Sequence, residues 1–195
     1  MKAYITEATG TLALALIVAL SLGGPIGVVT PLLAALVLGL FVYTTGHISG
    51  SHLNPAITIG AWSVRKISTK QAVGYIVSQF VGAGVVLLLM KNGFANAADL
   101  SVSGNWHVLA AETLGTFFFA FGIASVLFNK TPETVSGIVI GGSLLFGIMI
   151  AAFAGSNGML NPAVALSAGS FGLMYIIGPI IGSIAGMQAY RALKA

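Results

Sequence analysis

Long apolar stretches separated by short polar connections make up most of this chain. Six of them approach the roughly 20 residues that a helix needs to cross a bilayer. We therefore predict membrane-spanning helices near residues 4–22, 28–46, 71–90, 107–128, 135–153 and 172–193. The pattern is typical of an all-α integral membrane protein with several spans and leaves little chain for a separate soluble domain.

Two shorter apolar segments, residues 54–63 and 161–169, begin with the same tripeptide, Asn54-Pro55-Ala56 and Asn161-Pro162-Ala163. Asn is a preferred N-cap and Pro a preferred first helical residue, so each tripeptide predicts a helix start. Both segments are too short to cross roughly 30 Å of hydrocarbon, so we expect re-entrant half-helices. Their unpaired N–H groups and positive dipole ends need a polar partner, which a solute in a pore supplies.

The two halves of the chain repeat each other. Glu7-Ala8-Thr9-Gly10-Thr11 opens the first half and Glu112-Thr113-Leu114-Gly115-Thr116 the second, with the tripeptide Asn 47 and 49 residues further on. Three spans per half is an odd number, so the second half enters the membrane upside down. We predict a single channel domain, residues 1–195, built from inverted repeats at 1–98 and 104–195.

Composition narrows the function classes. Hydrophobic residues make up 57% of the chain and charged residues only 6%, a profile that suits lipid and not a soluble core. Cysteine is absent, and we find no P-loop, dinucleotide fingerprint or Ser-His-carboxylate grouping, so we expect no enzyme and no cofactor. His47, His52 and His107 provide too few ligands for a metal site. The net charge of +4 is too small and scattered to indicate nucleic acid.

Basic residues predict the orientation. Lys91 falls at one set of span ends, and the other seven fall at the opposite set: Lys2, Arg65, Lys66, Lys70, Lys130, Arg191 and Lys194. By the positive-inside rule both termini are cytoplasmic. We expect a multi-pass protein of the plasma or inner membrane.

The stretch Gly46-His47-Ile48-Ser49-Gly50-Ser51-His52-Leu53-Asn54-Pro55-Ala56, together with the second tripeptide, Gln79 and Pro179, resembles the aquaporin family, also called the major intrinsic proteins. The resemblance covers essentially the whole chain. It implies a bundle of six tilted helices with one pore per subunit, assembled in the lipid as a homotetramer. It also implies passive conduction of water and small neutral solutes, with ions excluded.

The resemblance also assigns roles to particular residues. Asn54 and Asn161 would donate hydrogen bonds to a solute at the middle of the pore. Backbone carbonyls would line the path from Gly50, Ser51, His52 and Leu53, and from Asn157, Gly158, Met159 and Leu160. Glu7 and Glu112 would accept hydrogen bonds from the pore loops. A proton relay through these glutamates is the alternative, because a carboxylate within a span is by default a functional candidate.

One position departs from the family pattern. Most relatives place Arg directly after the second tripeptide, where this chain has Val164. Offsets place the other residues of the family's selectivity filter at Ala34, Met149 and Gly158. We therefore expect the pore to be apolar and wide at this selectivity filter, which we call the outer neck, unless the side chain of Phe41, Tyr43 or Phe153 fills the space.

Such a neck should admit small uncharged solutes such as glycerol, urea, ammonia or undissociated metalloid acids along with water. Two alternatives stay open at this point. One is a coupled secondary transporter, which also uses inverted repeats and broken helices. The other is a non-conducting structural member of the same fold.

Overall fold

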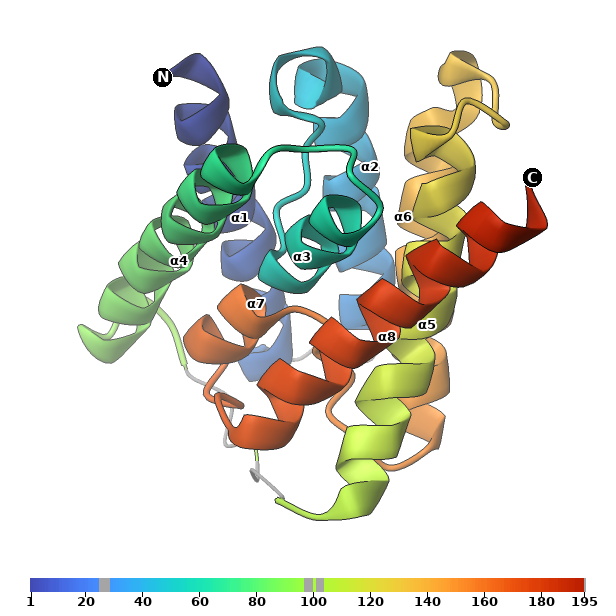
Figure 1. The fold of residues 1–195 in the computed structure, drawn as a ribbon. Helices are drawn as coiled ribbons and strands as arrows, with labels where there is room; N and C mark the ends of the chain where they lie inside the picture. Colours follow the sequence, from blue (N-terminus) through green and yellow to red (C-terminus); the bar gives the residue numbers. More distant parts are fainter. Residues whose placement is uncertain (25–28, 97–99, 101–103, 195) are drawn as a thin grey trace.

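The computed structural model describes residues 1–24, 29–96, 100 and 104–194. Within this part of the chain it is all-helical, with six long helices arranged around two short ones (Figure 1). The elements in chain order are α1 (Lys2–Gly23), α2 (Thr30–Ser49), α3 (Pro55–Ser63), α4 (Thr69–Lys91), α5 (Trp106–Leu127), the short 3-10 helix η2 (Glu133–Val135), α6 (Ser136–Phe153), α7 (Pro162–Ser167) and α8 (Leu173–Leu193).

The long helices confirm the predicted fold class, since six segments are long and apolar enough to cross a membrane. Most ends lie within two residues of those expected from the sequence. The second span differs, because α2 continues past Gly46 to Ser49. It ends there since Gly50 adopts a left-handed conformation, with φ 88°, and its N–H donates to the carbonyl oxygen of Gly46. The predicted start at residue 28 lies outside the described residues.

The short helices α3 and α7 are the expected half-helices. Each begins directly after its tripeptide Asn, with Pro as the first helical residue. In Figure 1 they lie one above the other in the middle of the bundle, and they contact each other. Helix α7 is shorter than expected, because it ends at Ser167 and the chain then turns at Gly169, whose φ is 79°.

Close helix crossings recur in both halves. A Cβ added to Gly82 on α4 would lie 2.2 Å from the carbonyl oxygen of Ala8 on α1. A Cβ added to Gly182 on α8 would lie at the same 2.2 Å from the carbonyl oxygen of Thr113 on α5. Glycine therefore lets the backbones of α1 and α4, and of α5 and α8, approach closely. Lipid provides no hydrophobic drive between helices, so such contacts replace it.

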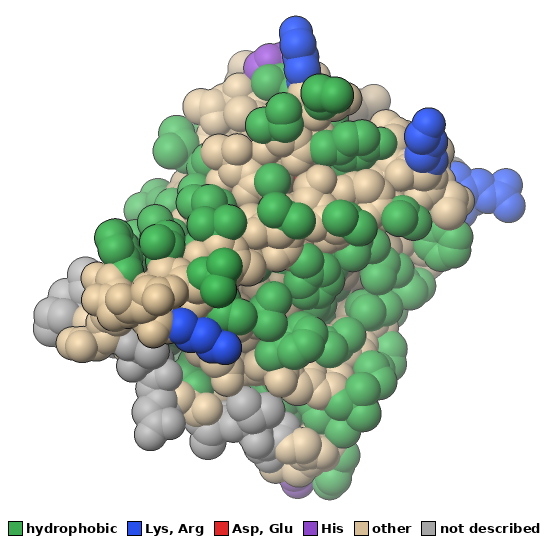
Figure 2. Space-filling model, turned by 90° about the vertical axis from the view of Figure 1, so that its left-hand side faces the viewer, with side chains coloured by type: hydrophobic (Ala, Val, Ile, Leu, Met, Phe, Trp, Pro, Cys, Tyr) green, Lys and Arg blue, Asp and Glu red, His purple; other side chains and the backbone are tan. Residues whose placement is uncertain are grey.

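The outer surface suits a lipid environment. On the face drawn in Figure 2, hydrophobic side chains are spread over the whole surface, the few basic side chains are far apart, and no acidic side chain is visible. Large apolar side chains such as Leu36, Val77 and Ile138 are exposed on the long helices. Polar side chains are instead buried between the helices, among them Glu7, Gln79 and Glu112. This distribution is the reverse of a soluble protein and matches an integral, multi-pass membrane protein.

Candidate functional site

The tripeptide asparagines cap the two half-helices. Asn54 Oδ1 accepts hydrogen bonds from the backbone N–H groups of Ala56, at 2.8 Å, and Ile57, at 3.4 Å. Asn161 Oδ1 accepts from the N–H groups of Ala163, at 3.0 Å, and Val164, at 3.4 Å. These bonds satisfy donors at the start of each helix that otherwise lack partners. They also fix the direction of each amide group.

The same asparagines tie each half-helix to the loop of the other half. Asn54 Nδ2 donates to the carbonyl oxygen of Leu160 at 2.9 Å. Asn161 Nδ2 donates to the carbonyl oxygen of Leu53, also at 2.9 Å. An amide NH₂ group has two hydrogens, so each asparagine keeps one N–H for another partner. Both side chains contribute to the lining of one cavity, where a solute can use these donors.

Glu7 binds the first pore loop through hydrogen bonds to its carboxylate. The side chain is fully buried, and its Oε1 accepts from the Ser49 hydroxyl at 2.6 Å and from the His52 N–H at 2.9 Å. Oε2 accepts from the Leu53 N–H at 2.7 Å and from Gln79 Nε2 at 2.8 Å. A carboxylate with four donors can remain buried, because each oxygen is compensated.

Glu112 does the same for the second loop. It is fully buried, and its Oε1 accepts from the Ser156 hydroxyl and from the Met159 N–H, the latter at 3.0 Å. Oε2 accepts from the Leu160 N–H at 2.7 Å. With their N–H groups turned toward the glutamates, the loops adopt conformations that L-residues rarely take, including φ values of 48° at Leu53 and 50° at Leu160.

We name two cavities outer and inner after the predicted orientation, and the outer one is lined by all four residues that the sequence assigned to the filter. Its volume is about 270 Å³. Ala34, Met149, Gly158 and Val164 line it. The two tripeptide asparagines line it as well. None of the described residues that line it is charged, and most are aliphatic.

The inner cavity is larger, at about 570 Å³, and its lining is more polar. Gly50, Ser51 and His52 of the first pore loop line it, together with His47 and Glu133. The expected carbonyl track is therefore divided between the two cavities. The second part of that track, at Asn157, Gly158 and Met159, lines the outer cavity.

Leu53 and Leu160 stand apart from the other expected carbonyl residues. Their side chains are fully buried, and their carbonyl oxygens accept the asparagine bonds described above. A carbonyl oxygen has two lone pairs, so each retains one acceptor site.

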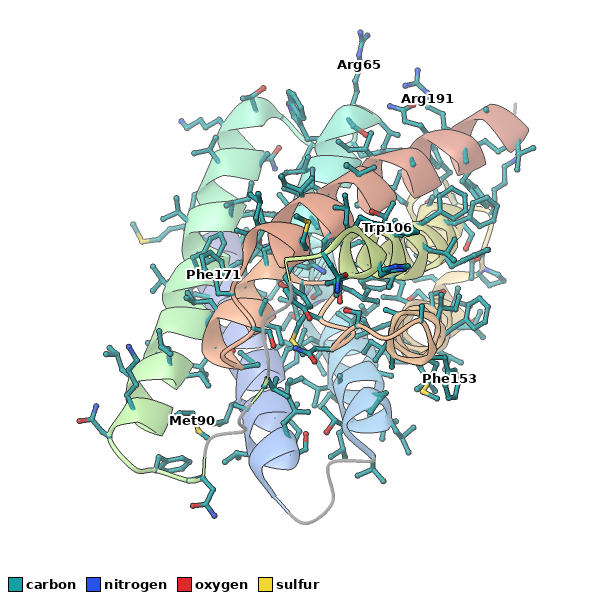
Figure 3. All side chains as sticks on the ribbon, turned by 90° about the horizontal axis from the view of Figure 1, so that it is seen from below. Arg65, Met90, Trp106, Phe153, Phe171 and Arg191 are labelled. Carbon is teal, nitrogen blue, oxygen red and sulfur yellow. The ribbon has the colours of Figure 1, made fainter. Side chains whose placement is uncertain are left out.

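The aromatic residues considered as filter substitutes lie elsewhere. Phe153 is 84% exposed and lies at the periphery of the bundle (Figure 3). The Tyr43 hydroxyl donates to the carbonyl oxygen of Thr134 at 3.2 Å, on the surface between α2 and η2. The Phe41 ring packs against Gly10. None of the three is among the described residues that line the outer cavity, because each faces a neighbouring helix or the surface. The expectation that one of them refills the neck is wrong.

Sequence reasoning missed several bulky lining residues, among them Leu14 and Phe119. Leu14 lines the outer cavity, and Phe119 lines both cavities. Each lies seven residues after the glutamate of its half, which is two helical turns further along the same face. Comparison of the two halves relates these two positions to each other but does not show that they face the pore.

The family is decided by a match along nearly the whole chain. The sequence model described as major intrinsic protein matches residues 1–190. The chain belongs to the major intrinsic protein family. Members of this family include proteins named as aquaporins, which agrees with the resemblance drawn from the two tripeptides.

Several curated relatives support the assignment. The aquaporin AqpM of Methanothermobacter thermautotrophicus is 29% identical over 177 residues, covering 79% of this chain and 72% of that protein. The probable aquaporin AqpM of Archaeoglobus fulgidus is 31% identical over 182 residues, covering 82% of this chain and 73% of that protein. Nodulin-26 of Glycine max is 33% identical over 171 residues, covering 82% of this chain and 63% of that protein.

A solved structure agrees with the fold. The X-ray structure of the aquaglyceroporin from Plasmodium falciparum is similar with a TM-score of 0.69, at 20% sequence identity, over 100% of this chain and 96% of that chain. The family match and the relatives named as aquaporins show that this major intrinsic protein is a passive channel for water and small solutes and not an enzyme. None of these similarities favours a coupled transporter or a non-conducting structural protein.

Proposed function

We propose that this channel passes water and small uncharged solutes larger than water, such as glycerol or urea, and excludes ions. The observation that carries the proposal is the lining of the outer cavity. Val164 supplies neither a hydrogen-bond donor nor a charge, and Gly158 supplies no side chain. A neutral solute therefore meets no fixed cation at this neck, whereas an ion would lose its hydration against aliphatic side chains.

Asn54 and Asn161 provide the polar part of the path. Each has one amide N–H beyond the bond to the opposite loop, and the positive ends of α3 and α7 lie beside them. These groups favour the oxygen of a neutral solute and disfavour a cation. Carbonyl oxygens of the two loops serve as acceptors for its hydrogens. Glu7 and Glu112 serve as supports of the loops in this proposal, since every hydrogen bond given above for them comes from a loop or from a neighbouring side chain.

We also propose the remaining features of the assembly from charge and topology. In Figure 3 the labelled side chains of Arg65 and Arg191 project at the same end of the molecule, which is consistent with a cytoplasmic basic face and cytoplasmic termini. The inverted repeats run over residues 1–98 and 104–195, although residues 98 and 195 lie outside the described part. In lipid, the apolar outer faces would pack against further copies of the chain, as expected for a homotetramer.

Solute flux into proteoliposomes tests the proposal directly. Vesicles containing the purified protein are shrunk with glycerol or urea, and light scattering follows both the loss of water and the re-swelling as solute enters. We expect faster shrinkage and faster re-swelling than in protein-free vesicles. Faster shrinkage without any faster re-swelling would show a strictly water-selective channel and refute the solute part of the proposal.

A further inference from the structure

Three side chains line both cavities: Leu38 of α2, His52 of the first pore loop and Phe119 of α5. A solute that passes between the outer and the inner cavity must therefore pass between them. Leu38 is 2% exposed and Phe119 is 1% exposed, so both are packed firmly into the bundle. We call Leu38, His52 and Phe119 the junction layer.

We infer that the junction layer, and not the outer neck, sets the size limit for solutes in this channel. The inference rests on the proposed function and specifies where its selectivity lies. At the outer neck Gly158 has no side chain, Ala34 and Val164 have short ones, and Met149 has an unbranched, flexible one. At the junction layer a phenyl ring, an imidazole ring and a branched aliphatic side chain face the same passage. The bulkier set leaves less room for a solute.

His52 is held in place from several sides, so it cannot simply swing away. Its backbone N–H donates to Glu7 Oε1 at 2.9 Å, and the ring nitrogen Nδ1 pairs with the Thr58 hydroxyl at 3.2 Å. Its ring lies edge to face against Tyr75, with centroids 5.3 Å apart. The Tyr75 hydroxyl in turn donates to the carbonyl oxygen of Ser49 at 2.9 Å. A rigid wall discriminates by size better than a mobile one.

The hydrogen bonds around Thr58 also define what His52 offers a solute. The Thr58 hydroxyl donates its single hydrogen to the carbonyl oxygen of Asn54 at 2.9 Å. Nδ1 of His52 is then the donor in the pair with Thr58, and Nε2 of the neutral ring is left as an acceptor. The junction layer thus presents one acceptor between two apolar walls. Water can satisfy it with one O–H, whereas urea and glycerol leave further N–H or O–H groups against Leu38 and Phe119.

The test compares the glycerol-to-water permeability ratio of variants in proteoliposomes. Phe119→Leu and Leu38→Ala enlarge the passage, and we expect each to raise the ratio severalfold. Leu38→Phe adds bulk without removing any core atom, and we expect it to lower the ratio. Val164→Ala widens the outer neck instead, and we expect it to raise the ratio less than either enlarging variant at the junction layer. Phe153→Ala is the control, because it shortens an exposed side chain that lines neither cavity, and it should leave the ratio at the wild-type value.

The outcomes separate this inference from the proposed function. The inference is overturned if the glycerol-to-water permeability ratio changes in Val164→Ala but stays at the wild-type value in the enlarging and narrowing variants at the junction layer. A wild type that conducts water alone, combined with a Phe119→Leu variant that admits glycerol, refutes solute conduction by the wild type and supports the inference. If vesicles with the wild type pass neither water nor glycerol faster than protein-free vesicles, both the inference and the proposed function are refuted. Thermal unfolding of each variant in detergent confirms that the compared proteins are folded.

Discussion

Replacement of Glu7 by Gln tests how the first pore loop is held. The carboxylate accepts four hydrogen bonds, two at each oxygen, whereas an amide provides only one acceptor oxygen. In the least costly arrangement the new NH₂ group faces Leu53 and Gln79. The Gln79 amide can then rotate to present Oε1, which has no partner among the described residues, although it loses the bond from its Nε2 to the Thr58 hydroxyl oxygen. The Leu53 N–H remains buried without an acceptor.

The magnitude follows from these contacts. An unsatisfied buried N–H costs about 1–3 kcal/mol, and a hydrogen bond to a neutral group is about 1 kcal/mol weaker than one to a charged group. With the Leu53 N–H unpaired and the bonds from Ser49 and His52 weakened, the sum is about 3–5 kcal/mol. Gln also avoids the cost of burying a charge, so this range is an upper value. Glu112→Gln leaves the Leu160 N–H unpaired in the same way, and a similar loss is expected.

Tryptophan fluorescence during thermal unfolding in detergent measures the stability, and light scattering of proteoliposomes measures water flux. We expect both Gln variants to unfold at lower temperature and to conduct water more slowly, because the loop carbonyls lose their fixed direction. Glu133→Gln is the matched control on an exposed carboxylate, for which a change within about 0.5 kcal/mol is expected. Unchanged unfolding and unchanged water flux in Glu7→Gln, with loss of a proton current, would refute the supporting role and favour a proton relay.

Three further predictions concern the pore and its orientation. Val164→Arg should narrow the outer neck and add fixed donors, so glycerol flux should fall more than water flux in proteoliposomes; an unchanged ratio would show that this position does not face the path. Asn161→Asp places a carboxylate between two positive helix ends, so proton or cation leak into vesicles should rise, and an unchanged leak in a well-folded variant would argue against a barrier at this site. Tags at residues 1 and 195 should both resist external protease in intact cells, and cleavage of either would contradict the assigned orientation.

Local signals in the sequence were sufficient for the helices and for the centre of the site. Apolar length determines which segments can cross a bilayer, and the six long helices confirm that prediction. The start of each half-helix was also predictable, because an Asn cap bonds to N–H groups only two and three residues further on. The internal repeat alone showed that Glu7 and Glu112 occupy equivalent positions in the two halves. That they would accept hydrogen bonds from the pore loops was expected only from the family resemblance, and the structure shows such bonds to loops more than 40 residues away along the chain.

The lining of the pore was decided by tertiary packing. In a membrane protein both the lipid-facing and the inward faces of a helix are apolar, so hydrophobic periodicity does not tell which face meets the pore. Leu38 and Phe119 therefore resembled any other apolar residue of their spans, and Phe153 seemed equally suited to the filter. The reciprocal bonds from Asn54 to Leu160 and from Asn161 to Leu53 join residues 106 and 108 positions apart. Such contacts depend on how the two halves pack against each other, which no local pattern in the sequence specifies.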